Sequence, residues 1–163
     1  MGTGKSSVGK RLAREMGLRF VDADDLIEKD AGMSIKEIFG RFGEARFREL
    51  ERKVLKTVAE TMDGVVLATG GGAVVDYRNR ELLRSWGVVV CLTASVEAIL
   101  DRVDEGDERP LLEGEDRRGS IERLLQERRD AYMDADLVLD TTEKSIAEVT
   151  EDIRRFLSMR EEA

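Results

Sequence analysis

The sequence contains no histidine, and this absence removes several classes of enzyme. None of its 163 residues is His, so a Ser-His-Asp triad, a histidine general base and a zinc site built on imidazole are excluded. A proton taken from a substrate must therefore go to another group. With 35 aspartate and glutamate residues in the chain, a carboxylate is the natural acceptor.

Cysteine and long apolar runs are also scarce. The one cysteine, Cys91, cannot form a disulfide within the chain, which indicates a cytoplasmic protein. It lies in the apolar run 88–92, where a buried small side chain is a better interpretation than a nucleophile. No apolar run approaches the ~20 residues that span a bilayer, so we expect no membrane partner.

Basic residues are outnumbered by acidic ones. The 27 lysines and arginines leave a net charge of −8 and a pI near 4.8, so we expect no general nucleic-acid binding. The length predicts a single domain over residues 1–163, which we expect to be a monomer.

A glycine-rich stretch opens the chain and leads into a helix predicted at Val8–Met16. Residues 1–7 match the distal part of the phosphate-binding pattern G-x-x-x-x-G-K-[ST]. Its amides and the helix N-terminus would hold a polyphosphate, the lysine would reach the outer phosphates, and the first serine would ligate Mg²⁺. The predicted nucleotide site is Gly2, Thr3, Gly4, Lys5, Ser6 and Ser7. A disordered leader is the alternative interpretation.

The phosphate-binding pattern is incomplete at its start. Its leading glycine would lie three residues before Gly2, and the strand that delivers the loop would lie before that glycine. We therefore expect the first strand of the sheet to be missing from this chain, because the true start lies upstream or the chain is cut.

Apolar runs alternate with helical patterns along the rest of the chain. Strands are predicted at 18–22, 64–69, 87–92 and 135–140, with helices between them. These helices include one at 34–40 and a last one near the end of the chain, which open with capping boxes at Ser34 and Ser145, and others at about 43–62 and 120–133. Such runs predict an α/β fold, a parallel sheet with helices on both faces, in the three-layer arrangement of P-loop NTPases. Ligands bind at the carboxyl ends of the strands in such folds.

Two groups of residues follow predicted strands at that edge. Asp22 and Asp24 could hold hydrated Mg²⁺, orient a substrate hydroxyl, or cap the next helix, and we favour a functional role. The glycines Gly70, Gly71 and Gly72 suggest close approach of backbone to a ligand, although a plain loop remains possible. The polar stretch 104–119 would form a lid that brings Arg109 onto a transferring phosphoryl group.

Six motifs in order resemble the shikimate kinase family over essentially the whole chain. They are Gly2-Thr3-Gly4-Lys5-Ser6, Asp22-Ala23-Asp24, Phe47-Arg48-Glu49-Leu50-Glu51, Gly70-Gly71-Gly72-Ala73, Arg109-Pro110-Leu111-Leu112 and the R-x-x-x-Y of Arg128 to Tyr132. Without the family, Arg48 and Arg128 would pass for members of solvated surface pairs. The resemblance implies a nucleoside monophosphate kinase-like fold and ATP-dependent phosphorylation of shikimate to shikimate 3-phosphate.

The resemblance also implies a role for each motif. Asp24 would bind the reacting hydroxyl and act as base, and Asp22 would contact Mg²⁺ through water. Substrate-binding helices would span about 24–62. The substrate carboxylate would meet guanidinium groups, and Arg102 would lie near adenine. The implied substrate site is Asp24, Arg48, Gly70, Gly71, Gly72 and Arg128, and the implied catalytic set is Asp24, Lys5 and Arg109.

Two other functions stay open at this point. One is a different small-molecule kinase of the P-loop group, acting on gluconate or a nucleoside monophosphate. The other is a nucleotide-binding module that lacks catalysis because of the truncated start.

Overall fold

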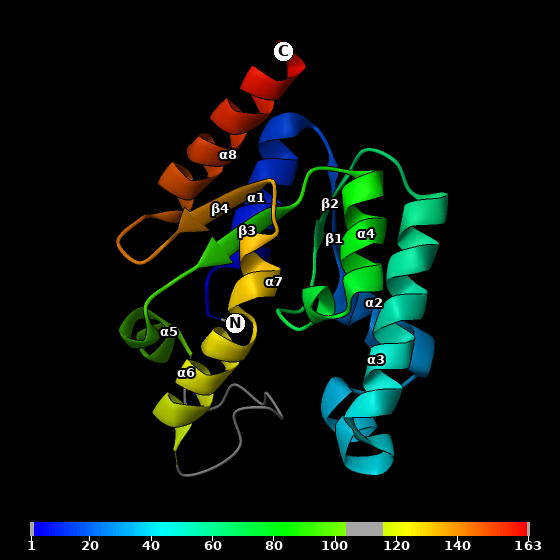
Figure 1. Ribbon diagram of the computed structural model, residues 1–163. Helices are drawn as coiled ribbons and strands as arrows, with labels where there is room; N and C mark the ends of the chain where they lie inside the picture. Colours follow the sequence, from blue (N-terminus) through cyan, green and yellow to red (C-terminus); the bar gives the residue numbers. More distant parts are fainter. Residues whose placement is uncertain (1, 104–115, 163) are drawn as a thin grey trace.

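Four short parallel strands carry the fold, and they form two pairs. The structure, a computed structural model, describes residues 2–103 and 116–162. Strand β1 (Arg19–Asp22) pairs with β2 (Val65–Ala68), with Arg19 opposite Val65 and Asp22 opposite Ala68. Strand β3 (Val90–Thr93) pairs in the same sense with β4 (Leu137–Asp140). Figure 1 shows the two pairs side by side, with β3 and β4 pointing the same way.

Helices connect and cover the strands. In chain order they are α1 (Lys5–Met16), α2 (Ala23–Ala31), α3 (Ile35–Thr61), the short 3-10 helix η1 (Ala73–Val75), α4 (Tyr77–Trp86), α5 (Val96–Arg102), α6 (Arg117–Glu127), α7 (Arg129–Met133) and α8 (Ile146–Glu161). None of the helices in the described ranges is long and apolar enough to cross a membrane.

Apolar side chains pack on both faces of the strands. On one face, Val8 and Leu12 of α1 join Val149 and Ile153 of α8 in a cluster that also contains Leu92 of β3. On the other face, residues of α3 and α4 pack against Leu67 and Val89. The three-layer α/β arrangement predicted from the alternating pattern is therefore confirmed (Figure 1).

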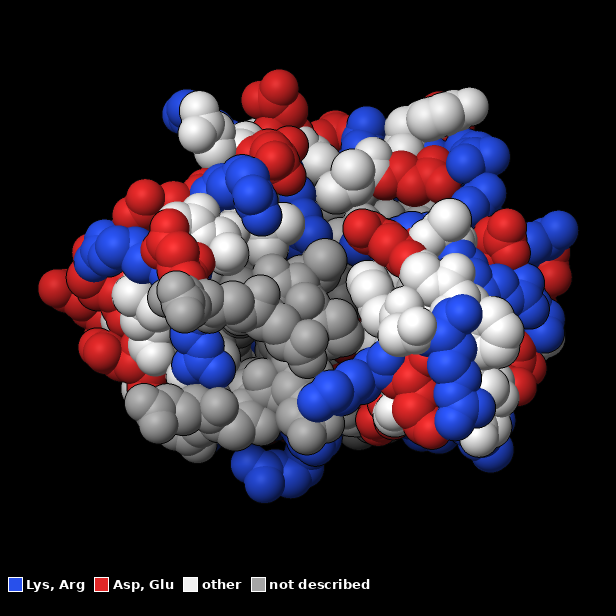
Figure 2. Space-filling view, turned by 90° about the horizontal axis from the view of Figure 1, so that it is seen from below, with Lys and Arg blue, Asp and Glu red and all other residues white. Residues whose placement is uncertain are grey.

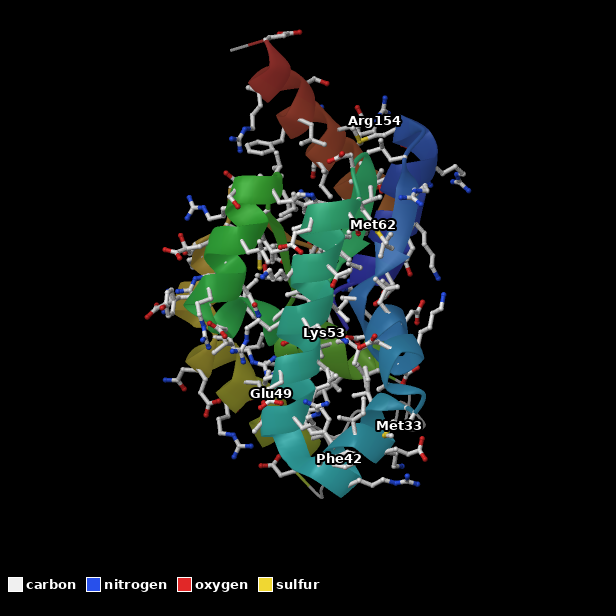
Figure 3. The ribbon with its side chains drawn as sticks, turned by 90° about the vertical axis from the view of Figure 1, so that its right-hand side faces the viewer. Met33, Phe42, Glu49, Lys53, Met62 and Arg154 are labelled. Carbon is white, nitrogen blue, oxygen red and sulfur yellow. The ribbon has the colours of Figure 1, made fainter. Side chains whose placement is uncertain are left out.

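The helix α3 lies between α2 and α4 and is the longest element of the fold. Figure 3 shows it running from Phe42 near one end to Met62 at the other. Lys53 forms an ion pair of 2.8 Å with Asp30 of α2. Beneath these polar groups, a second core joins Ile27, Ile38 and Phe47 with the inner face of α3. This packing fixes the helices on which two of the predicted site residues lie.

Several helices begin where the sequence predicts. Ser34 and Ser145 each form a capping box with the glutamate three residues later, which satisfies free amides at the first turns of α3 and α8. The predicted break between helices 34–40 and 43–62 is a kink at Gly43, whose φ of 78° interrupts one long element. Left-handed backbone of this kind favours glycine.

Several boundaries differ from the sequence prediction; for example, the helix predicted at Val8–Met16 begins at Lys5, and the strand predicted at 135–140 begins at Leu137. The strand predicted at 87–92 begins only at Val90, because the Gly87 N–H caps α4 and the Val89 carbonyl accepts from Asp136. The helix predicted at 120–133 begins earlier, at Arg117, and is divided at Arg128, whose φ of −100° and ψ of 0° lie outside the helical range. The predicted lid 104–119 thus overlaps the first turn of α6, and residues 104–115 lie outside the described ranges.

The two strand pairs do not join into one sheet among the described residues. β2 pairs only with β1 and β3 only with β4, and a cavity of about 440 Å³ separates β2 from β3. No residue in the described part before Lys5 is in a strand.

Candidate active site

The phosphate-binding loop lies at the edge where the strands end. Gly2 and Gly4 have φ values of 61° and 87°, which turn the backbone into the N-terminus of α1. A residue far along the chain fixes the loop: the hydroxyl of Thr141 donates to the Thr3 carbonyl at 3.2 Å. Thr3 itself is buried, at 5% exposed. Lys5 donates toward the Thr3 hydroxyl at 3.4 Å. The N-terminus of α1 points its positive dipole end at this loop and can therefore receive an anion.

Ser6 and Asp22 come together from different elements. The Ser6 hydroxyl donates to Asp22 Oδ2 at 2.9 Å, so the end of β1 touches the first turn of α1. Asp22 also caps α2, since its other oxygen accepts from the Asp24 N–H at 3.1 Å. Asp22 therefore caps α2, and the carboxylate of Asp24, inside the first turn of that helix, does not act as the cap.

Asp24 faces the glycine-rich loop and a buried glutamate. A Cβ built on Gly70 would lie 3.5 Å from Asp24 Oδ1 and 3.3 Å from Glu51 Oε1. The carboxylate of Asp24 after β1 and the carboxylate of Glu51 on α3 therefore both lie near the backbone of Gly70 after β2. A side chain at this position would press against Glu51 and touch Asp24, so Gly70 leaves the space between the two carboxylates open.

Arg48 and Glu51 form the centre of the substrate side. Arg48 Nη1 lies 2.8 Å from Glu51 Oε2, and Nη2 lies 3.0 Å from Glu44 Oε1. Glu51 is 1% exposed, and its Oε1 has no hydrogen-bond partner among the described residues. Burial raises the pKa of the Glu51 carboxyl, and the nearby charge of Asp24 adds to the rise that Arg48 opposes. Burial acts against the charge of Arg48, but its ion pairs raise its pKa overall.

Arg128 approaches the same place from the junction of α6 and α7. Its positive charge acts on the buried Glu51 carboxylate, so Arg128 lies within electrostatic range of Glu51. It also lines the cavity between the strand pairs together with Lys5, Gly70 and Gly71. One turn later, the Tyr132 hydroxyl donates to the Gly71 carbonyl at 2.9 Å. This bond ties the helix that follows Arg128 to the glycine-rich loop.

Arg102 braces the opposite side of the phosphate loop. Its Nη2 donates to the Thr141 carbonyl at 2.6 Å and to the Thr142 carbonyl at 3.1 Å, and its Nη1 reaches the Gly2 carbonyl at 3.4 Å. Arg102 therefore lies beside the phosphate loop and braces it, and its implied place near adenine stays a prediction. Arg109 lies outside the described residues.

The arrangement is suited to Mg²⁺ that arrives with a nucleotide. Among residues 2–103 and 116–162, no group of three or more acidic or cysteine side chains could hold a metal ion alone. The neighbouring Ser6 hydroxyl and Asp22 carboxylate offer two oxygens. Mg²⁺ prefers such sites, because it keeps several waters and takes its other ligands from phosphates.

Charge on this edge of the molecule is mixed. Figure 2 views it from below and shows Lys and Arg interspersed with Asp and Glu.

Sequence reasoning missed three residues that shape the site. The motifs contain Glu51 and Tyr132 but give neither a role in the site. No sequence pattern indicates Asn79. Asn79 is 2% exposed and donates to the Ala73 carbonyl at 2.9 Å, which holds the turn after the three glycines. Only the R-x-x-E and R-x-x-x-Y spacings could have pointed to the first two.

Comparisons with known proteins agree with this geometry. The family model described as shikimate kinase matches residues 1–158. A protein named shikimate kinase from Geobacter sulfurreducens is 52% identical over 96% of this chain and 86% of its own length. One of the same name from Thermodesulfovibrio yellowstonii is 44% identical over 94% of this chain and 88% of its own.

Solved structures give the same result. Shikimate kinase from Acinetobacter baumannii in complex with shikimate superposes with a TM-score of 0.93 at 35% identity, covering 98% of this chain and 89% of that one. The enzyme from Aquifex aeolicus gives a TM-score of 0.81, also at 35% identity, over 98% of this chain and 92% of its own. The chain therefore belongs to the shikimate kinase family.

Proposed function

We propose that this chain transfers the terminal phosphoryl group of ATP to shikimate and forms shikimate 3-phosphate. The observation that carries the proposal is the convergence of Asp24, Arg48 and the Gly70–Gly72 backbone around Glu51, beside a phosphate-binding loop. A carboxylate that can accept a hydroxyl proton and guanidinium groups that can grip an acid are what a hydroxy-acid kinase requires. The Acinetobacter baumannii relative was solved with shikimate bound.

The substrate carboxylate is assigned to Arg48 and Arg128. Arg48 is 24% exposed, so one side of its guanidinium stays accessible while Glu44 and Glu51 hold the other. A fixed guanidinium binds a carboxylate in the paired manner that a flexible ammonium cannot match. The glycines at 70–72 supply close backbone and leave room for the ring.

The nucleotide is assigned to the phosphate loop and Arg102. Gly2, Thr3, Gly4, Lys5, Ser6 and Ser7 would surround its phosphates, and the resemblance adds Arg109 from the segment outside the described residues. Ser6 would hold Mg²⁺ directly and Asp22 through water, and the bound ion would neutralise charge on the phosphates.

Catalysis in this site is positioning and charge stabilisation. Asp24 aligns the attacking hydroxyl and accepts its proton. Lys5 neutralises charge on the transferring group, and Arg48 and Arg128 fix the acceptor so that attack is in line. No covalent intermediate on the chain is required.

A substrate panel tests the proposal. ADP release from ATP and Mg²⁺ is measured with shikimate, gluconate and a nucleoside monophosphate in parallel. We expect ADP release with shikimate and not with gluconate or the nucleoside monophosphate. ADP release with either of these two acceptors at a comparable kcat/KM would assign the chain to another kinase of this group. Specific nucleotide binding with no turnover on any acceptor would favour a binding module instead.

A further inference from the structure

We propose that Arg80, on α4, is a positioning residue for phosphoryl transfer: it fixes the glycine-rich loop (Gly70–Gly72) against Arg48 and Asp24 and ties that loop to α7. This role rests on the proposed function above, since the acceptor is taken to be shikimate. Arg80 lies in none of the six motifs, so the role comes from its contacts alone.

The glycine-rich loop is fixed to η1 by backbone hydrogen bonds. The Ala73 N–H donates to the Gly70 carbonyl at 3.0 Å, and the Val75 N–H donates to the Gly72 carbonyl at 3.1 Å. Ala73 and Val75 are the first and last residues of η1. The position of the first and third glycines therefore depends on the position of η1.

Side chains from the first turn of α4 hold η1 in turn. The side-chain amide of Asn79 donates to the Ala73 carbonyl at 2.9 Å. Arg80 Nη1 donates to the Val74 carbonyl at 2.7 Å and to the Val75 carbonyl at 3.1 Å. All three carbonyls of η1 thus accept from α4, and two of them accept from one charged group. Hydrogen bonds from a charged donor are stronger than neutral ones, so Arg80 is the main restraint on η1.

Arg80 also binds the end of α7. Its Nε donates to Asp134 Oδ2 at 3.1 Å, and Asp134 directly follows the last residue of α7. Two residues earlier, the Tyr132 hydroxyl donates to the Gly71 carbonyl at 2.9 Å. α7 is therefore joined to the glycine-rich loop twice, directly through Tyr132 and indirectly through Asp134, Arg80 and η1. Arg128 lies at the start of the same helix.

The glycine-rich loop lies close to two groups that are assigned to the acceptor. A Cβ built on Gly72 would lie 2.8 Å from the Arg48 guanidinium carbon, and one built on Gly70 would lie 3.5 Å from Asp24 Oδ1. A shift of η1 would move the loop relative to both groups. The phosphate-binding loop precedes a different helix, α1, so loss of Arg80 should affect the acceptor and not the nucleotide.

The contacts of Arg80 require a guanidinium. Its donors lie on a rigid planar fork, so one nitrogen can bind two carbonyls while another binds a carboxylate. Lysine would keep the positive charge but has a single ammonium on a flexible stem. Arg84 provides a matched comparison, because it pairs with the same Asp134 carboxylate at 2.5 Å. It has no hydrogen bond to η1 among the described residues.

Steady-state kinetics of three variants of the full chain test the role of Arg80. Arg80→Gln should raise the KM for shikimate about fivefold or more and leave the KM for ATP within about twofold. Arg80→Lys should stay within about twofold of Arg80→Gln, because the fork and not the charge holds η1. Arg84→Gln should change neither KM. Equal rises in both KM values, an unchanged shikimate KM in Arg80→Gln, or its recovery in Arg80→Lys would overturn the proposal.

Amide hydrogen exchange separates this role from the proposed function, because it needs no substrate. The two η1 amides that donate to the glycine carbonyls, those of Ala73 and Val75, should exchange about fivefold faster or more in Arg80→Gln. In Arg84→Gln they should exchange at the rate of the unmodified chain. If the unmodified chain does not turn over shikimate, the proposed function fails and exchange decides about Arg80. Unchanged exchange at both amides in Arg80→Gln would overturn the proposal in either case.

Discussion

The guanidinium of Arg48 is held 2.8 Å from the buried carboxylate of Glu51 and lies directly against Gly72. A Cβ added at Gly72 would meet the guanidinium carbon of Arg48 at 2.8 Å, well inside normal contact. Gly72 has a φ of −89°, which any residue adopts. The glycine is therefore needed for space beside the arginine rather than for its backbone conformation.

Gly72→Ala should displace Arg48 and weaken shikimate binding. We expect the KM for shikimate to rise about tenfold or more, equivalent to about 1.4 kcal/mol, with the KM for ATP unchanged. Steady-state kinetics with each substrate varied in turn measure this. Gly40→Ala is the matched control, because a Cβ at Gly40 meets nothing within 4 Å. An unchanged shikimate KM in Gly72→Ala would remove Arg48 from the substrate site.

Glu51→Gln should change how stability depends on pH. Burial raises the pKa of Glu51 in the folded chain, so the folded state holds this proton more tightly than the unfolded state. The stability contributed by the proton is complete below the unfolded pKa of about 4.3 and is lost as pH rises through the raised folded pKa. Glu51→Gln has no carboxyl group at this position, so its stability does not fall with pH for this reason.

Urea unfolding at a series of pH values checks the effect. The unfolding free energy of the unmodified chain minus that of Glu51→Gln should fall as pH rises above about 4.3. Glu49→Gln is the control, since Glu49 is exposed and pairs with Arg46 on the surface. Parallel pH curves for the unmodified chain and Glu51→Gln would show that Glu51 titrates normally.

Asp22→Asn should separate metal affinity from helix capping. Asparagine still accepts the Asp24 N–H and is as good a cap as aspartate, so thermal stability should change little. The Mg²⁺ concentration for half-maximal activity should rise about tenfold or more, as expected for a group that orients metal-bound water. Asp76→Asn, which changes the cap of α4 in the same way, should leave the Mg²⁺ requirement unaltered.

Asp24→Asn tests the assignment of the base. The amide cannot accept the hydroxyl proton, so kcat should fall by about 10²- to 10⁴-fold while the Kd for ATP stays within about twofold. Single-turnover kinetics and nucleotide titration provide the two measurements. Asp25→Asn, one residue later and exposed, should behave like the unmodified chain. Near-normal kcat in Asp24→Asn would rule out Asp24 as the base.

Local pattern predicted most of the fold, because each signal is contained within a few residues. The capping boxes at Ser34 and Ser145 and the apolar strands needed no knowledge of distant contacts. Local pattern failed where a distant group decides. The strand predicted from Gly87 begins late because the Val89 carbonyl is used by Asp136, a residue far along the chain.

Contacts between residues distant in the sequence also limit what could be predicted about the candidate site. Arg48 and Glu51 have the spacing of an ordinary surface pair on a helix, and sequence alone could not show that Glu51 is 1% exposed. Its burial comes from the loop at Gly70–Gly72, which lies against α3 only in the folded chain. The motifs identified which residues matter, and tertiary packing identified what they touch.

Tyr132→Phe should show that Tyr132 positions the glycine-rich loop for the acceptor. The change removes only the hydroxyl that donates to the Gly71 carbonyl at 2.9 Å and keeps the ring. A lost hydrogen bond of about 0.5 to 1.5 kcal/mol predicts a rise of about two- to tenfold in the shikimate KM. Tyr77→Phe is the control, because Tyr77 is 60% exposed. A merely structural role would lower thermal stability and leave both KM values unchanged. We expect the opposite: the shikimate KM rises, the ATP KM does not, and Tyr77→Phe changes neither.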